Sequence, residues 1–242
     1  YLYKLMKKIK KFNFIKVFDL QNSSRTNFYQ KVLFPNSNAS KWSSSSTTLP
    51  LNQTKVKFDK DSVLERFDHQ LKNSGIQTKH TLNPDFSWSC CDISHIFSKY
   101  NLKKYIILFP FCSPHLSIKK WPHYDEFIRI FKKKYKTYDV IVAPGPGELN
   151  EATKINANCI LDNGKALNIF QLSSLIKKSS FVIANDTGPA HMSAHLDAKG
   201  IALFGSHTTA EKVSIETKNF KAIQVHDLSK LSPQKVIEKI SF

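Results

Sequence analysis

Short apolar runs alternate with helical patterns through the second half of the chain, from residue 104 to the end. The runs are rich in β-branched and aromatic residues and predict strands at 105–109, 138–143, 159–161, 181–184, 201–204 and 222–225. The segments between and after them predict helices near 123–135, 147–155, 168–178, 189–197, 209–213 and 233–241. This alternation is typical of a parallel sheet covered by helices on both faces, whose ligands bind at the carboxyl ends of the strands.

The first half of the chain has a weaker pattern. Residues 2–12 carry apolar residues at helical spacing with lysines between them and predict an amphipathic helix, and residues 14–20 predict a strand. The Ser/Thr-rich segment 41–50 has no core-forming pattern and predicts a loop. Residues 61–73 predict a helix that begins with capping chemistry and ends at Gly75.

Two domains follow from this pattern. Residues 83–103 show few periodic signals and are expected to connect a domain at 1–82 with a domain at 104–242. The length of 242 residues suits two domains of ordinary size. The chain begins at Tyr1, without an initiator Met or the apolar core of a signal peptide. We therefore expect the first domain to be incomplete, with residues missing upstream.

The charge balance is strongly basic, with 36 Lys and Arg against 19 Asp and Glu. A net charge of +17 favours polyanions such as nucleic acid, an anionic membrane surface or phosphorylated substrates. Nearly all the basic residues are lysines, and arginine stands only at 25, 66 and 129. A lysine excess of this kind also fits the codon drift of an AT-rich genome, and a dedicated nucleic-acid binder uses more arginine. We expect no nucleic-acid partner.

The predicted location is the cytoplasm. No apolar run approaches the ~18–20 residues that a membrane-spanning helix needs. The four cysteines have neither metal spacing nor the density of a disulfide framework, so reduced thiols are expected. The basic amphipathic helix at 2–12 fits either packing within its own domain or a peripheral contact with an anionic inner-membrane surface, and both alternatives stay open.

The most informative residues follow the strand at 181–184, where the sequence NDTGPAH (185–191) leads into a helix. Gly188 permits close approach of a ligand, and Pro189 suits a first helical turn. Free amides at that helix start, together with the Thr187 hydroxyl, form a cradle for an anion.

Three further loops follow other predicted strands. They contain Cys112-Ser113 with Lys119-Lys120-Trp121-Pro122, the run APGPGE at 143–148, and GSHT at 205–208. Together the four loops supply hydroxyls, amides, a lysine and an acid at one edge of the sheet. This combination suits a nucleoside diphosphate.

These segments resemble the ADP-heptose:lipopolysaccharide heptosyltransferase family. The D-T-G-x-x-H run at 186–191 with the following strand and Phe204-Gly205 carries the resemblance most specifically. Lys119-x-Trp121-Pro122 and Gly145-Pro146-x-Glu148 occur in the family's order, and Asp19-Leu20-Gln21 with Arg25 is similar to a stretch of its first domain. The resemblance implies a GT-B fold of two facing Rossmann-like domains, here with the N-terminal one incomplete. It also implies an enzyme without metal or other cofactor.

The resemblance implies roles at the donor site. The C-terminal domain would hold an ADP-heptose-like nucleotide sugar, with Lys119 on the diphosphate and Thr187 and Gly188 around its oxygens. Asp186 would contact the sugar, and Glu148 the nucleoside.

Further roles are implied with less detail. His191 would steady the loop or a phosphate, and Ser113 would add a hydroxyl contact; Lys120 is an alternative to Lys119 as the phosphate partner. Arg25 would face the lipopolysaccharide-core acceptor in the N-terminal domain. The family's general base precedes the first residue of this chain, so the catalytic residue is unassigned and catalysis is expected to need roughly 60–70 upstream residues.

Other features of the sequence allow different interpretations. Asp59-Lys60-Asp61 has the D-x-D form of a metal-dependent glycosyltransferase, but at a helix start it is expected to cap the helix. His191 and His195 have a spacing compatible with zinc, without the glutamate of H-E-x-x-H. A dinucleotide-binding Rossmann enzyme lacks its G-x-G-x-x-G here, and a basic nucleic-acid-binding protein lacks a recognised module.

Overall fold

The computed structural model describes residues 2–12, 14–35 and 41–242, and the chain divides into two compact units, Tyr1–Asn83 and Pro84–Phe242. The boundary lies one residue from the predicted end of the first domain. The segment 84–103, expected as a connection, belongs to the second unit. Ile93 and Ile96 explain this, because both are buried in the core of that unit. Within the described residues, no helix is long and apolar enough to cross a bilayer.

Over its described residues, 2–12, 14–35 and 41–83, the first unit contains a small parallel sheet and four helices. Its elements are α1 (Leu2–Lys10), β1 (Val17–Phe18), α2 (Ser24–Leu33), β2 (Trp42–Ser43), α3 (Lys55–Phe58) and α4 (Val63–Asn73). Strands β1 and β2 pair in parallel. The expectation that 41–50 is only a loop was wrong, because Trp42 and Ser43 form β2 and are buried. Hydroxyl hydrogen bonds, such as the one from Thr48 Oγ1 to the Ser44 carbonyl (2.7 Å), let this polar segment be buried.

The N-cap of α4 is Ser62, whereas the sequence predicted that the Asp59-Lys60-Asp61 segment caps this helix. The Ser62 hydroxyl accepts from the Glu65 N–H, and the Glu65 carboxylate accepts from the Ser62 N–H. Asp59 instead ends α3 and pairs with Lys55 at 2.5 Å. Gly75 ends the α4 segment with φ +83°, as predicted.

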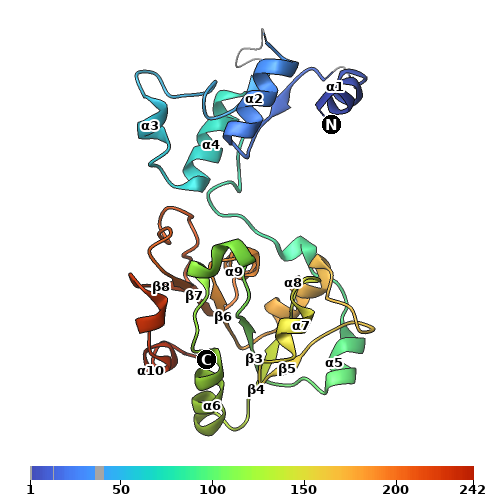
Figure 1. Cartoon of the computed structure of the whole chain (residues 1–242), viewed down its shortest axis with the longest axis vertical. Helices are drawn as coiled ribbons and strands as arrows, with labels where there is room; N and C mark the ends of the chain where they lie inside the picture. Colours follow the sequence, from blue (N-terminus) through green and yellow to red (C-terminus); the bar gives the residue numbers. More distant parts are fainter. Residues whose placement is uncertain (1, 13, 36–40) are drawn as a thin grey trace. The chain divides into compact units, whose positions relative to one another are not determined.

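The second unit is a doubly wound α/β domain (Figure 1). Its strands are β3 (Tyr105–Phe109), β4 (Asp139–Val142), β5 (Asn158–Cys159), β6 (Phe181–Asn185), β7 (Gly200–Phe204) and β8 (Phe220–Gln224). They form one parallel sheet in the order β5-β4-β3-β6-β7-β8. Each of the six strands overlaps the apolar run that predicted it, although β5 shares only Cys159 with the predicted run at 159–161.

Helices cover both faces of this sheet. They are η1 (Ser87–Ser89), α5 (Ser94–Tyr100), η2 (Pro114–Lys119), α6 (Tyr124–Lys134), α7 (Leu149–Ala152), α8 (Ile169–Lys177), α9 (Gly188–His195), η3 (Leu228–Lys230) and α10 (Pro233–Ile237). One apolar core lies under α5, α8 and α9, and the other under α6 and α10. The helix predicted at 209–213 is a series of turns, and Ser214 follows it with φ +55°, a conformation that does not continue a helix.

Candidate functional site

The site lies where the strand order of the second unit reverses. The chain runs from β3 outward to β4 and β5, then returns to β6 beside β3 and continues to β7 and β8. The loops that leave the carboxyl ends of β3 and β6 therefore diverge, and ligands of such sheets bind in the crevice between them. The NDTGPAH segment and the loop that contains Lys119 are these two loops.

Asn185, the buried last residue of β6, ties the two loops together. Its Nδ2 donates to the Pro110 carbonyl at 2.9 Å. Its Oδ1 accepts from the Trp121 N–H at 3.2 Å and from the Tyr124 hydroxyl at 3.1 Å. The loop after β3 is therefore fixed against the end of β6, which positions the Lys119 side chain.

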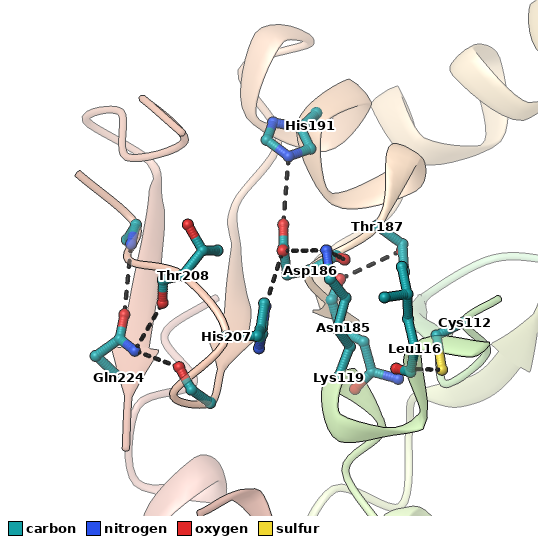
Figure 2. A network of polar contacts seen from close by, with 12 residues as sticks. Cys112, Leu116, Lys119, Asn185, Asp186, Thr187, His191, His207, Thr208 and Gln224 are labelled. Carbon is teal, nitrogen blue, oxygen red and sulfur yellow. Dashed lines mark hydrogen bonds and ion pairs between the residues drawn. The ribbon is translucent and has the colours of Figure 1, made fainter. Parts of the chain in front are cut away.

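Three side chains make polar contacts with the Asp186 carboxylate, as Figure 2 shows. Lys119 Nζ lies 2.7 Å from Oδ2 and 3.3 Å from the Asp186 carbonyl oxygen. His207 Nε2 lies 2.9 Å from the same Oδ2, and His191 Nε2 lies 3.4 Å from Oδ1. We call these four residues the Asp186 cluster. Asp186 is only 4% exposed, so its charge is held by these partners rather than by water.

The Asp186 carboxylate is ionised at neutral pH. Burial raises its pKa, but the hydrogen bonds from His191, Lys119 and His207 lower it by more, so that the pKa lies well below the ordinary value. An ammonium group has three N–H donors. Two of those of Lys119 are directed at Asp186, which leaves one for a ligand.

The start of α9 adds backbone donors beside the cluster. Thr187 is the N-cap residue, but its hydroxyl donates back to the Asn185 carbonyl at 3.3 Å and does not cap the helix. The first-turn amides therefore have no side-chain cap from this residue, and the positive end of the helix dipole favours an anion. A Cβ added at Gly188 would meet nothing within 4 Å, so the backbone is open to close approach there.

Several other predicted residues have different surroundings. Glu148 Oε2 accepts from the Gly145 N–H at 2.7 Å and so closes its own loop after β4. Ser113 is exposed at the start of η2, and its side chain makes no cap hydrogen bond. Lys120, the alternative to Lys119, is exposed and pairs with Glu151. Arg25 is exposed on α2 in the first unit.

His207 is the residue that sequence reasoning missed. It belongs to the GSHT loop after β7, which the sequence places at a strand end, but no spacing distinguishes its imidazole from an ordinary turn residue. Only its distance to Asp186, 21 positions away in the sequence, reveals the contact.

A zinc site at His191 and His195 is not supported by the geometry. His191 points to Asp186, whereas the His195 ring packs edge-on against Phe86 with centroids 5.3 Å apart. Burial, together with the nearby His191, lowers the pKa of His195. Over residues 2–12, 14–35 and 41–242, no group of three or more His, Cys, Asp or Glu residues is arranged to hold a metal ion.

Comparison with known proteins identifies the fold and the family. The model of glycosyltransferase family 9 (heptosyltransferase) matches residues 2–239. No protein with curated annotation matches the sequence.

Three solved structures have a similar fold. E. coli ADP-heptose lps heptosyltransferase II has a TM-score of 0.65 at 15% identity, with 98% of this chain and 78% of that chain covered. A glycosyl transferase family 9 protein from Veillonella parvula has a TM-score of 0.66 at 15% identity, with 98% and 76% covered. E. coli heptosyltransferase WaaC with ADP-2-deoxy-2-fluoro heptose has a TM-score of 0.52 at 19% identity, with 78% and 56% covered. The chain therefore spans between 56% and 78% of the length of these proteins, and the predicted GT-B fold class is confirmed.

Proposed function

Because the chain belongs to glycosyltransferase family 9 (heptosyltransferase), we propose that it takes part in transferring a heptose or related sugar from a nucleotide donor to a lipopolysaccharide-core acceptor. The second unit, residues 104–242 with the segment before it, serves as the donor-binding domain. The first unit serves the acceptor. The structure of WaaC with ADP-2-deoxy-2-fluoro heptose supports an ADP-linked donor.

The observation that carries this proposal is the Asp186 cluster at the strand-order reversal, beside the start of α9. A diphosphate there would receive the remaining Lys119 N–H and the first-turn amides at Thr187 and Gly188. Asp186 itself is anionic and would repel phosphate, so it holds Lys119 in place and faces the sugar hydroxyls, for which a carboxylate is an acceptor. His191, one third exposed, steadies the loop through Asp186.

The remaining predicted contacts involve Glu148, Ser113 and Arg25. Glu148 accepts the Gly145 N–H through Oε2, which leaves Oε1 as an acceptor for a hydroxyl of the nucleoside, so the loop contact would orient the carboxylate for that role. The exposed hydroxyl of Ser113 is free to turn toward a ligand. Arg25 would bind an acidic group of the acceptor from the first unit.

The chemistry follows from where charge develops. Transfer breaks the bond between the anomeric carbon and the phosphate oxygen, and the electron pair goes to the diphosphate. The acceptor hydroxyl forms the new bond from the opposite face, which inverts the anomeric centre, and its proton goes to a base that is not assigned to a residue of this chain. Fixed donors at the leaving oxygen stabilise the developing charge, and Lys119 with the α9 amides supplies them without a metal.

The proposal includes a peripheral contact with the membrane surface. The α1 helix carries exposed Lys4, Lys7 and Lys8, and exposed Phe12 follows it. Basic and aromatic side chains together favour the surface of an anionic bilayer. This contact would bring the cytoplasmic enzyme to an acceptor that is anchored in the inner membrane.

Calorimetry with ADP, UDP, NAD and a DNA duplex tests the proposal. We expect ADP or UDP to bind in the micromolar to millimolar range and NAD and DNA to bind more weakly. Absence of binding by both nucleoside diphosphates at millimolar concentration would remove the donor site. Tighter binding of DNA would favour a nucleic-acid-binding protein instead.

A further inference from the structure

His207 is the most completely enclosed of the three side chains that donate to Asp186. Its side chain is 9% exposed, against 21% for Lys119 and 34% for His191. Its Nε2 lies 2.9 Å from Asp186 Oδ2, the same oxygen that Lys119 contacts at 2.7 Å. Lys119 and His207 therefore hold one oxygen atom from two different loops, as Figure 2 shows.

The loop that carries His207 is itself held in place. Gln224, the last residue of β8, donates from Nε2 to the Gly205 carbonyl at 2.6 Å and to the Thr208 carbonyl at 3.2 Å. The His207 ring also stacks on Phe204, with an angle of 12° between the rings and 6.0 Å between centroids. Both contacts fix the imidazole before any ligand arrives.

The hydrogen-bonding pattern determines the tautomer of His207. A carboxylate only accepts, so Nε2 must carry the proton that it donates to Asp186. Nδ1 is buried and has no hydrogen-bond partner among the described residues. A second proton on Nδ1 would be a buried donor without an acceptor, so the geometry favours the tautomer with a single proton, on Nε2.

We propose that His207 is a positioning residue of the donor site, acting through Asp186 on Lys119. Its neutral Nε2–H fixes Asp186 Oδ2, and the fixed carboxylate holds the Lys119 ammonium with one N–H left for the leaving diphosphate. A neutral donor suits this role, because it orients the carboxylate without competing with Lys119 for its charge. The nucleotide-binding test of this inference rests on the proposed function, whereas the lysine-reactivity and tautomer tests do not.

A pair of substitutions separates the hydrogen bond from packing. His207→Phe keeps a ring to stack on Phe204 but loses the donor, and His207→Gln keeps an N–H donor but loses the ring. The exposed His226 provides a control as His226→Phe. Three measurements apply to the full chain: ADP affinity by calorimetry, the rate of acetylation of Lys119 by acetic anhydride with Lys120 as internal reference, and the 15N chemical shifts of the His207 imidazole.

We expect His207→Phe to weaken ADP binding about tenfold, the equivalent of one hydrogen bond, and to raise the acetylation rate of Lys119 relative to Lys120. His207→Gln should recover most of the affinity, and His226→Phe should match the wild type. In the wild type, the 15N shifts should show a neutral ring protonated on Nε2.

The outcomes are distinct. A proton on Nδ1 in the wild type would overturn the inference whatever the variants do, including the case in which His207→Phe fails to fold. Unchanged ADP affinity and unchanged Lys119 reactivity in a folded His207→Phe would also overturn it. If the wild type binds neither ADP nor UDP, the proposed function fails, and the Lys119 reactivity together with the tautomer then decides the role of His207.

Discussion

Removal of the Lys119 ammonium tests the donor site most directly. In Lys119→Ala, a ligand loses the one N–H that Asp186 does not use. Asp186 keeps His191 and His207 as partners, so the buried carboxylate is not left without donors. The second unit should therefore stay folded, and the loss should appear mainly in ligand binding.

The expected magnitude follows from the type of contact. A hydrogen bond between an ammonium and a phosphate oxygen is charge-assisted and contributes about 1.5–3 kcal/mol. Lys119 is 21% exposed, so solvent weakens the contact only in part. Since 1.4 kcal/mol corresponds to a factor of ten, ADP affinity should fall roughly ten- to hundredfold.

Lys120→Ala is the matched control. Lys120 is the next residue in the sequence and carries the same charge, but it is exposed and pairs with Glu151. Calorimetric titration of ADP into the wild type and both variants, with thermal unfolding to verify the fold, compares the two variants with each other at equal net charge. A larger loss of affinity in Lys120→Ala, or no loss in a folded Lys119→Ala, would refute the assignment of Lys119 to the diphosphate.

Three further outcomes are expected. Thr187→Val should weaken ADP binding by about 1 kcal/mol, because the hydroxyl that donates to the Asn185 carbonyl at 3.3 Å would turn to a phosphate oxygen of ADP and so exchange one hydrogen bond for another. An unchanged calorimetric affinity would exclude the hydroxyl from the site. Gly200→Ala should lower the unfolding free energy of the second unit, measured in urea, by about 3 kcal/mol, because the new Cβ would lie 2.6 Å from both the Val182 carbonyl oxygen and the Phe220 ring. In the control Gly147→Ala the new Cβ would have nothing within 4 Å, so the unfolding free energy should change little. Equal losses of stability in the two variants would contradict the packing. The pKa of Asp186 is lower in the folded chain than its value of about 3.9 in the unfolded chain, so the ionised carboxylate stabilises the fold above about pH 4 and this stabilisation is lost as the pH falls toward the folded pKa. The difference in unfolding free energy between the wild type and Asp186→Asn should therefore shrink on acidification below about pH 4. A difference that does not depend on pH would contradict the ionised state.

The sequence alone was sufficient for the architecture of the second unit. Its four central strands, β4, β3, β6 and β7, are buried almost throughout, so each appears as a local apolar run, and the helices between them follow the period of 3.6 residues. The segment from Asn185 to His191 was identifiable for a similar reason, because a glycine and a proline at a strand-to-helix junction restrict the backbone locally. The same local signals failed at 209–213, where a five-residue pattern is too short to specify a helix.

Tertiary structure decided which polar groups meet. Lys119 and Asp186 are 67 positions apart, and His207 is 21 positions beyond Asp186, so no local period relates them. Glu148 has the residue type and the loop position of a ligand contact, but only the structure shows that its Oε2 accepts from the Gly145 N–H three residues away. The buried Ser43 shows the same limit in the first unit, since its polarity indicated a loop and its hydroxyl found a partner in Gln70 at 3.2 Å. The sequence identifies the chemistry of each polar side chain. The partner of that side chain is selected by the packing of strands and helices, which brings distant segments together.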